Sequence, residues 1–175
     1  MNARRSGVAL LCLLAAVLLT GCYPDLDWRE LRSNDGGFAV MFPAKPNEVT
    51  REVKIGGTAL RLHMLSAEVN GMAFGVGYAD LPADVDGNVL LAAARDGLVH
   101  NINGRISIEQ PVTLPGLNGQ EFQAEGTAQD KPMLVAARLL IGSDKLYQIT
   151  FIGPREQSAE VDLAFYLGSF KMLSL

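Results

Sequence analysis

Polar and apolar residues alternate along most of the chain after residue 28, in runs that glycine, asparagine and proline interrupt. A period of two residues is typical of a strand with one buried face, because successive side chains point to opposite sides. Turns such as Asn70-Gly71 and Gly142-Ser143-Asp144 join neighbouring runs into antiparallel hairpins. The pattern predicts strands over residues 28–31, 38–42, 48–55, 59–68, 72–78, 105–114, 120–126, 132–141 and 145–152.

The period changes to that of a helix after residue 86. Asp84 or Asp86 can cap this helix at its start, and Asn103-Gly104 can end it. A second helix is predicted from Ser158, as its cap, to about residue 167, and residues 169–175 form an apolar end that docks on the domain. The buried stripe of the first helix is predicted to contain Leu91, Ala94, Leu98 and Ile102.

Hairpins interrupted by one helix and closed by another indicate the α+β class, with an antiparallel sheet of about six to eight strands covered by two helices. On one side of residues 72–79 all side chains are small, which predicts that a helix or another backbone packs closely there. Gly75-Val76-Gly77 also begins like a dinucleotide-binding motif. Asp80 stands in place of its third glycine, and the segment lies inside a strand, so close packing is the better interpretation.

The start of the chain has a different pattern. Arg4 and Arg5, with no acidic residue nearby, precede an apolar run over residues 8–19. A basic segment followed by such a run is typical of a secretory signal peptide. The run is shorter than the ~20 residues that a membrane-spanning helix needs. We therefore interpret residues 1–21 as a signal peptide that is removed.

The end of this segment, Leu19-Thr20-Gly21-Cys22, resembles the bacterial lipobox. The resemblance implies cleavage before Cys22, a diacylglyceryl group on its sulfur, and a fatty acid such as palmitate on its new amine. Two or three acyl chains hold a protein on a membrane far better than one. Residues 22–27 would form a lipidated tether and residues 28–175 a single domain. The alternative is an ordinary signal peptide that leaves Cys22 as a structural thiol.

Cysteine count and charge agree with this interpretation. Cys12 lies in the removed segment, so the mature chain has Cys22 alone and no internal disulfide. Removal of Arg4 and Arg5 lowers the basic residues from 15 to 13 against 19 acidic residues, a net charge of −6. Such a chain has no electrostatic footprint for nucleic acid, and without a polybasic patch the lipid would be its main membrane contact. Tyr23 is not the Asp that marks inner-membrane retention, so in a Gram-negative cell we expect the periplasmic face of the outer membrane.

Several short segments follow one another in an order that resembles a known fold. The order is similar to the PsbP/Mog-type fold, an α/β/α sandwich around an antiparallel sheet, and to small bacterial envelope proteins like it. Proteins of that fold include a photosystem II accessory subunit and a Ran-binding protein, and no functional motif of these two matches here. The resemblance therefore implies a fold and no particular function. The segments that carry it are residues 35–46, Leu114-Pro115-Gly116, Gly119-Gln120-Glu121-Phe122, Leu146-Tyr147-Gln148-Ile149 and Ser169-Phe170.

Groups with catalytic or metal-binding chemistry are few. Asp84-Val85-Asp86 opens like a calcium loop, but Val89 and Arg95 stand where that loop needs Gly and Glu, so a capping turn is the better interpretation. His63 is predicted at a solvated or sheet-edge position and His100 in the last turn of the first helix. Two distant histidines without a thiol do not predict a zinc site. We expect no catalytic residue, no metal and no cofactor.

The sequence favours a non-catalytic envelope module that binds a protein partner, a factor near peptidoglycan or a small ligand. One alternative is a hydrolase-type enzyme in which a histidine meets a carboxylate and a hydroxyl from dispersed residues. Another is a carrier of a small apolar ligand, with a cavity beside Gly75 and Gly77. Trp28 is predicted to belong to the core. Solvent-facing positions are predicted for Gln120, Glu121 and Arg138.

Overall fold

The predicted hairpins form one large antiparallel sheet in the computed structural model, which describes residues 26–173. Its seven strands lie in the order β3-β4-β5-β9-β8-β7-β6, within the expected six to eight. Each strand predicted for this region is present, and most extend beyond their predicted ends. Their bounds are β3 Asn47–Ile55, β4 Thr58–Val69, β5 Met72–Asp80, β6 Arg105–Leu114, β7 Leu117–Ala128, β8 Lys131–Ile141 and β9 Lys145–Pro154.

Tight turns set the register of these hairpins. Asn70 and Gly71 have φ angles of 51° and 76°, the left-handed conformation that a two-residue hairpin turn requires. Val69 therefore pairs directly with Met72 across the turn between β4 and β5. Because a shift of one residue would turn every buried side chain towards solvent, this local turn fixes which face of each strand is apolar.

A second, three-stranded antiparallel sheet lies apart from the large one. It contains β1 (Arg29–Ser33), β2 (Phe38–Phe42) and β10 (Lys171–Met172), in the order β1-β2-β10. β1 and β2 form the hairpin predicted around residues 33–37. The apolar C-terminal segment docks, as predicted, and it does so as a strand: Met172 pairs with Phe38 of β2.

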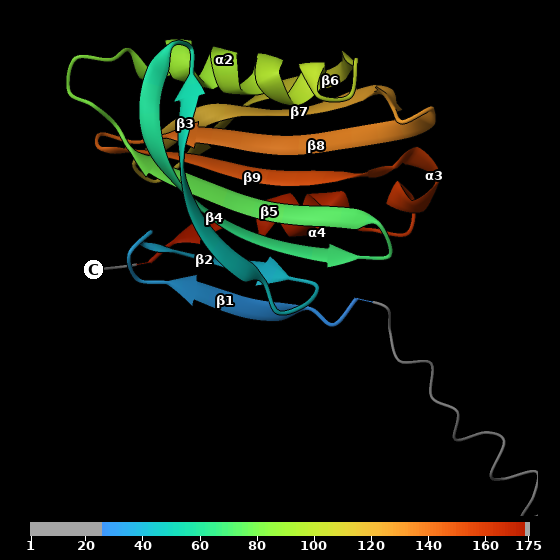
Figure 1. The fold of residues 1–175 in the computed structure, drawn as a ribbon. Coiled ribbons are helices and arrows are strands. Elements are labelled where there is room, and N and C mark those ends of the chain that lie inside the picture. Colours follow the sequence, from blue (N-terminus) through green and yellow to red (C-terminus); the bar gives the residue numbers. More distant parts are fainter. Residues whose placement is uncertain (1–25, 174–175) are drawn as a thin grey trace, which may run out of the picture.

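Different layers cover the two faces of the large sheet (Figure 1). Helix α2 (Gly87–His100) packs on one face against β7 and β8, while the small sheet and the short helix α4 (Leu163–Gly168) cover the other. Each face has its own apolar core, with Leu91 and Phe122 in the first and Phe38 and Phe151 in the second. The α+β class is confirmed. Within residues 26–173 we find no helix with the length and apolar character needed to span a membrane.

The capping turn predicted before α2 is confirmed. The carboxylate of Asp86 accepts a hydrogen bond from the backbone N–H of Asn88 at 2.9 Å, which satisfies one of the free donors of the first turn. The helix ends at His100, and Asn103, with a φ of 45°, redirects the chain into β6.

The prediction of a second helix starting at Ser158 was wrong. The structure has two short helices there, α3 (Arg155–Ser158) and α4. The hydroxyl of Ser158 donates to the carbonyl of Arg155 at 2.7 Å, so it closes α3 and caps no later helix. Asp162 caps α4 by accepting from the N–H of Phe165 at 2.9 Å. Val161 between them is buried, which favours a turn at this point over a continuous helix.

The small residues of β5 have a different role from the one predicted. A Cβ atom at Gly77 would lie 3.3 Å from the Leu62 side chain, and one at Gly75 would lie 3.0 Å from the hydroxyl of Thr150. Side chains of the neighbouring strands β4 and β9 therefore fill this space, where we had predicted a helix or another backbone.

Candidate functional site

The predicted lipid-attachment site lies outside the described residues. Cys22 and the preceding Leu19, Thr20 and Gly21 come before residue 26, so their assignment stays a prediction. The described chain begins at Leu26, and the N–H of Asp27 donates to the carbonyl of Pro43 at 2.8 Å. This bond holds the start of the domain against the end of β2.

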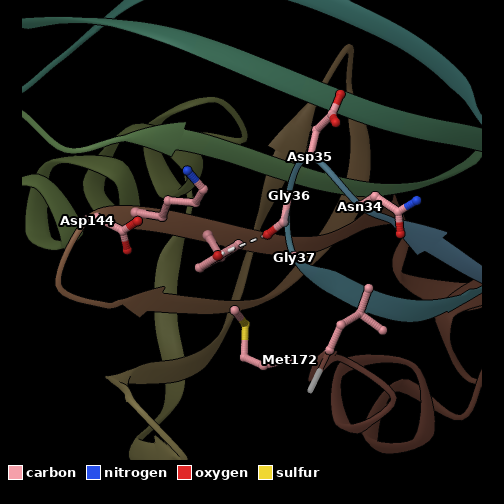
Figure 2. A pocket seen from close by; sticks show the side chains of 9 residues that line it. Asn34, Asp35, Gly36, Gly37, Asp144 and Met172 are labelled. Carbon is pink, nitrogen blue, oxygen red and sulfur yellow. Dashed lines mark hydrogen bonds between the residues drawn. The ribbon is translucent and has the colours of Figure 1, made fainter. Parts of the chain in front are cut away.

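A hollow of about 550 Å³ lies at one end of the molecule, where the β1–β2 turn faces the β8–β9 turn (Figure 2). Its volume is within the ~300–1,000 Å³ typical of small-molecule sites. Three distant parts of the chain meet there, namely the first hairpin, the start of β9 and the C-terminal strand. We call it the turn pocket, and it is lined by Asn34, Asp35, Gly36, Gly37, Asp144, Lys145, Tyr147, Met172 and Leu173.

Tyr147 forms the floor of the turn pocket and positions its first turn. Its ring is buried, with 2% exposure, and its hydroxyl donates to the carbonyl of Gly36 at 3.0 Å. The rings of Phe38 and Phe170 pack against it with centroids 6.1 and 5.4 Å away. Burial raises the pKa of Tyr147, so the phenol stays a neutral donor at neutral pH. The residue is therefore suited to hold a turn and not to accept a proton.

The rim of the turn pocket is charged. The Lys145 ammonium lies 2.5 Å from an Asp80 carboxylate oxygen, and this hydrogen bond raises the pKa of Lys145. Asp35 and Asp144 are exposed rim residues. The mouth thus presents carboxylate acceptors beside a lysine that is already paired, while Met172 supplies an apolar wall. Such a mixed rim suits the binding of a ligand that carries hydrogen-bond donors and an apolar part.

Neither histidine lies in the turn pocket. His63 is half-buried on β4, stacks on Tyr78 with centroids 4.9 Å apart, and has Nδ1 3.0 Å from the hydroxyl of Thr50. The predicted sheet-edge position was wrong, because β4 pairs with β3 on one side and β5 on the other, and Tyr78 covers one face of the ring. His100 is exposed at the last residue of α2, as predicted. Within the described residues, no carboxylate forms a hydrogen bond or ion pair with either histidine.

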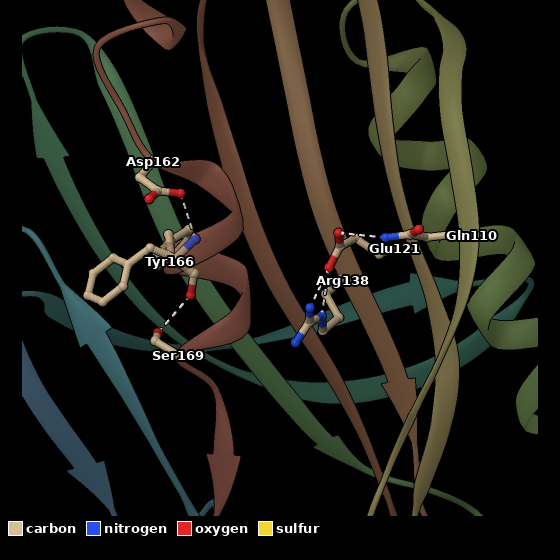
Figure 3. Close-up of polar contacts among 7 residues, drawn as sticks. Gln110, Glu121, Arg138, Asp162, Tyr166 and Ser169 are labelled. Carbon is tan, nitrogen blue, oxygen red and sulfur yellow. Dashed lines mark hydrogen bonds and ion pairs between the residues drawn. The ribbon is translucent and has the colours of Figure 1, made fainter.

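The prediction that Glu121 and Arg138 face solvent was wrong. They form an ion pair between β7 and β8, with the Arg138 Nε 2.9 Å from Glu121 and only 14% and 18% of the Arg138 and Glu121 side chains exposed (Figure 3). The Gln110 amide donates to the same carboxylate at 3.2 Å. Gln120 is half-buried as well, on the opposite face of β7. Gln120 and Glu121 are neighbours on β7 and therefore point to opposite faces of the sheet, and both faces are covered.

A second hollow, of about 240 Å³, lies between α2 and the β3–β4 hairpin. Leu62 and Gln148, which flank Gly77 on either side, form part of its lining, so it adjoins the position predicted for an apolar carrier site. Its volume is below the ~300 Å³ at which small-molecule sites begin. It therefore gives weaker support to a carrier than the turn pocket gives to a binding module.

Sequence reasoning did not gather the residues of the turn pocket into a site. Asp35-Gly36-Gly37 was interpreted as a turn and Leu146-Tyr147 as part of a strand. Both segments belong to those that carry the resemblance to the PsbP/Mog-type fold, and this was the one signal that could have linked them. The alternation of polar and apolar residues cannot show that two distant segments are in contact. In the part of the chain that the structure covers, His, Cys, Asp and Glu side chains form no group of three or more that could hold a metal ion.

Solved structures resemble this fold. The solution structure of cyanobacterial PsbP (CyanoP) from Synechocystis sp. PCC 6803 is similar over 87% of this chain and 95% of its own, with a TM-score of 0.54 and 12% identity. LpqN of Mycobacterium tuberculosis, described as involved in cell envelope biogenesis, has a TM-score of 0.47 and 14% identity, over 85% of this chain and 79% of its own. No protein-family model and no curated protein matches the sequence. At these identities the likeness shows the fold alone, and the fold is PsbP-like.

Proposed function

We propose that the protein is a lipid-anchored accessory module of the bacterial envelope, which binds a partner or small ligand in the turn pocket without transforming it. The observation that carries this proposal is the turn pocket itself, a hollow of about 550 Å³ framed by two sheets. The hydrogen bond from Tyr147 of β9 to Gly36 holds one turn of its lining in place, which lowers the entropic cost of binding.

The groups of the pocket favour binding over catalysis. The Tyr147 hydroxyl is used by the Gly36 carbonyl, and the Lys145 ammonium is paired with Asp80. A nucleophile or general base needs a free, activated group near its substrate. The exposed carboxylates of Asp35 and Asp144 are suited instead to accept hydrogen bonds from a ligand with amine, amide or hydroxyl groups.

The anchor comes from the sequence. The signal peptide and lipobox support acylation of Cys22 on the periplasmic side, and the outer membrane is the favoured location in a Gram-negative cell. Mass spectrometry of the mature N-terminus and membrane fractionation of Cys22→Ala test this. We expect a diacylglyceryl-modified Cys22 in the wild type and loss of Cys22→Ala from the membrane fraction. An unmodified thiol with full membrane association of the variant would overturn the anchor.

Site-specific photo-crosslinking tests the pocket. A photoreactive amino acid at Asn34, on the pocket rim, should capture a specific envelope component in living cells, and Asp35→Lys in the same protein should abolish the product. The matched control carries the photoreactive residue at Ile108, which is exposed on β6 and is not a pocket residue. Identical products from both positions, or no effect of Asp35→Lys, would contradict binding at this pocket.

The enzyme alternative makes a different prediction. The Thr50–His63 hydrogen bond is the described contact closest to a catalytic pair. His63→Gln should leave the function of the protein in the envelope intact if the module only binds. Loss of function in a folded His63→Gln variant would favour an enzyme.

A further inference from the structure

An exposed, uncharged aromatic surface lies beside the point where the chain enters the domain. Phe165 is 44% exposed, and the ring of Trp28 meets it edge-on with centroids 5.3 Å apart. On the opposite side, Trp28 packs against Phe74 and Tyr166, at 5.8 and 5.9 Å. The aromatic pair is therefore fixed to the core and cannot fold away from solvent.

Helix α4 extends this surface. Its sequence is Leu-Ala-Phe-Tyr-Leu-Gly, and its exposed residues Ala164, Phe165 and Gly168 carry no charge. Asp162 at its start is engaged as the cap of the helix, and the flanking Asp27 and Arg29 pair with each other. We name Trp28, Ala164, Phe165 and Gly168 the aromatic patch. The patch itself is uncharged, and the flanking Asp27, Arg29 and Asp162 together carry a charge of −1, in keeping with the acidic mature chain.

We propose that the aromatic patch rests in the headgroup region of the membrane that holds Cys22, so that the domain has one fixed orientation on the bilayer. This inference rests on the proposed lipid anchor. Six residue steps separate Cys22 from Trp28, and at ~3.6 Å per step the Cα atom of Trp28 cannot lie more than about 22 Å from that of the acylated cysteine. Trp and other aromatic rings favour the membrane–water interface, where their apolar body and polar edge are both satisfied.

The charge of the domain favours a membrane surface with little net charge. The patch has no Lys or Arg of its own to attract anionic headgroups, and the body of the domain is acidic. Contact of the aromatic patch with zwitterionic lipid should therefore be at least as strong as its contact with anionic lipid. In this orientation the face of the large sheet that α2 covers points away from the membrane, because α2 and α4 lie on opposite faces of that sheet (Figure 1).

Trp28 is the one tryptophan of the chain, so its fluorescence reports directly on the patch. The acylated protein is reconstituted into phosphatidylcholine vesicles with or without bromine on the acyl chains near the headgroup. We expect brominated lipid to reduce Trp28 emission by about a third or more, because an indole at the headgroup level lies within contact distance of the bromine. Replacing a third of the lipid with phosphatidylglycerol should leave quenching unchanged or weaken it.

Two variants of matched exposure control the test. Phe165→Ser should lower the quenching at least about twofold, because it removes the ring that widens the patch. Ile108→Ser, which replaces another exposed apolar side chain on β6, should leave it unchanged. Thermal unfolding of both variants checks that they remain folded. Acylated protein that floats with the vesicles and shows equal emission in brominated and ordinary lipid would overturn the proposal.

Failure of the anchor and failure of the patch can be told apart. The mature chain has a single thiol, so a chain starting at Cys22 can be coupled to a maleimide-bearing lipid and placed on vesicles whether or not cells acylate it. Quenching of Trp28 in this protein supports the patch even if native Cys22 proves unmodified, and its absence overturns the patch alone. A dimer of the soluble Cys22→Ala domain that Phe165→Ser dissociates would assign the patch to a second copy and also overturn it.

Discussion

Two buried tyrosine hydroxyls tie the layers of the molecule together. Tyr166 of α4 lies 3.0 Å from the carbonyl of Gly75 and 3.3 Å from that of Thr150, and Tyr147 donates to Gly36. Burial raises the pKa of both phenols, most strongly that of Tyr166. In an unfolded chain a tyrosine has a pKa of ~10, so above that pH the folded and unfolded states differ in the protonation of these two phenols.

Stability should therefore fall in alkali. Above pH ~10 the unfolded state releases the Tyr166 proton while the folded state keeps it, so the free energy of unfolding falls by about 1.4 kcal/mol per pH unit for this residue. Below pH ~10 the contribution is fully present. Urea unfolding between pH 9 and 11.5 should show a shallower decline in Tyr166→Phe, apart from a constant offset for the lost hydrogen bond. If the free energy of unfolding declined with pH equally steeply in the wild type and in Tyr166→Phe, this account would be contradicted.

The Glu121–Arg138 pair should be coupled in stability. Removing Arg138 leaves a half-buried carboxylate with Gln110 as its remaining partner, and we expect a loss of about 1–3 kcal/mol for Arg138→Met. In a double-mutant cycle, Glu121→Gln with Arg138→Met should lose less stability than the sum of the single changes. The exposed Asp27–Arg29 pair is the control and should show no measurable coupling. Additive losses at Glu121 and Arg138 would mean that the pair contributes nothing.

At the scale of elements, local signals were sufficient for the hairpins and for α2. Asp86 was one of two candidate caps, and its hydrogen bond to Asn88 distinguishes it from Asp84. The C-terminal helices were predicted less well, because Ser158 and Asp162 are both good cap residues and only packing chooses between them. Val161 enters the core, and that contact with distant strands turns the chain before α4 begins.

The cap gives an element-scale prediction. Asp86→Ala should lower the free energy of unfolding by about 1 kcal/mol, because an N–H at the start of α2 loses its acceptor. Asp84→Ala, two residues earlier and exposed, should change it by less than about 0.5 kcal/mol. Chemical denaturation followed by circular dichroism measures both. Equal losses in the two variants would show that the contribution of Asp86 is not a capping effect.

At the scale of the whole molecule, the small sheet has no core of its own. Phe38 of β2 is fully buried and packs against Tyr78, Tyr147 and Phe170 from the large sheet and the C-terminal segment. The two sheets therefore share one apolar layer and should unfold together. This shared layer also supports the floor of the turn pocket.

Cooperativity can be tested with Phe38→Ala, which should lower the free energy of unfolding by about 3–5 kcal/mol. Trp28 fluorescence, which reports on the side of the small sheet, and circular dichroism of the whole chain should still give coincident transitions. Val89→Ala on the exposed side of α2 is the control and should have little effect. An early fluorescence transition would show that the small sheet unfolds independently.

The sequence by itself determined the strands, the hairpin turns and α2 with two candidate caps, because each depends on residues close together in the chain. The lipid anchor is a prediction of the same local kind. Tertiary structure decided what those elements face. Alternation shows which side chains share a face of a strand, but not whether that face is covered, as Glu121 and Arg138 demonstrate: both were predicted to face solvent and are largely buried. The separate small sheet, closed by β10, and the turn pocket, in which Tyr147 bonds to a carbonyl 111 residues away, depend on contacts between distant segments. The aromatic patch likewise needs Trp28 and Phe165 side by side, a pairing set by the packing of α4 and not by either local sequence.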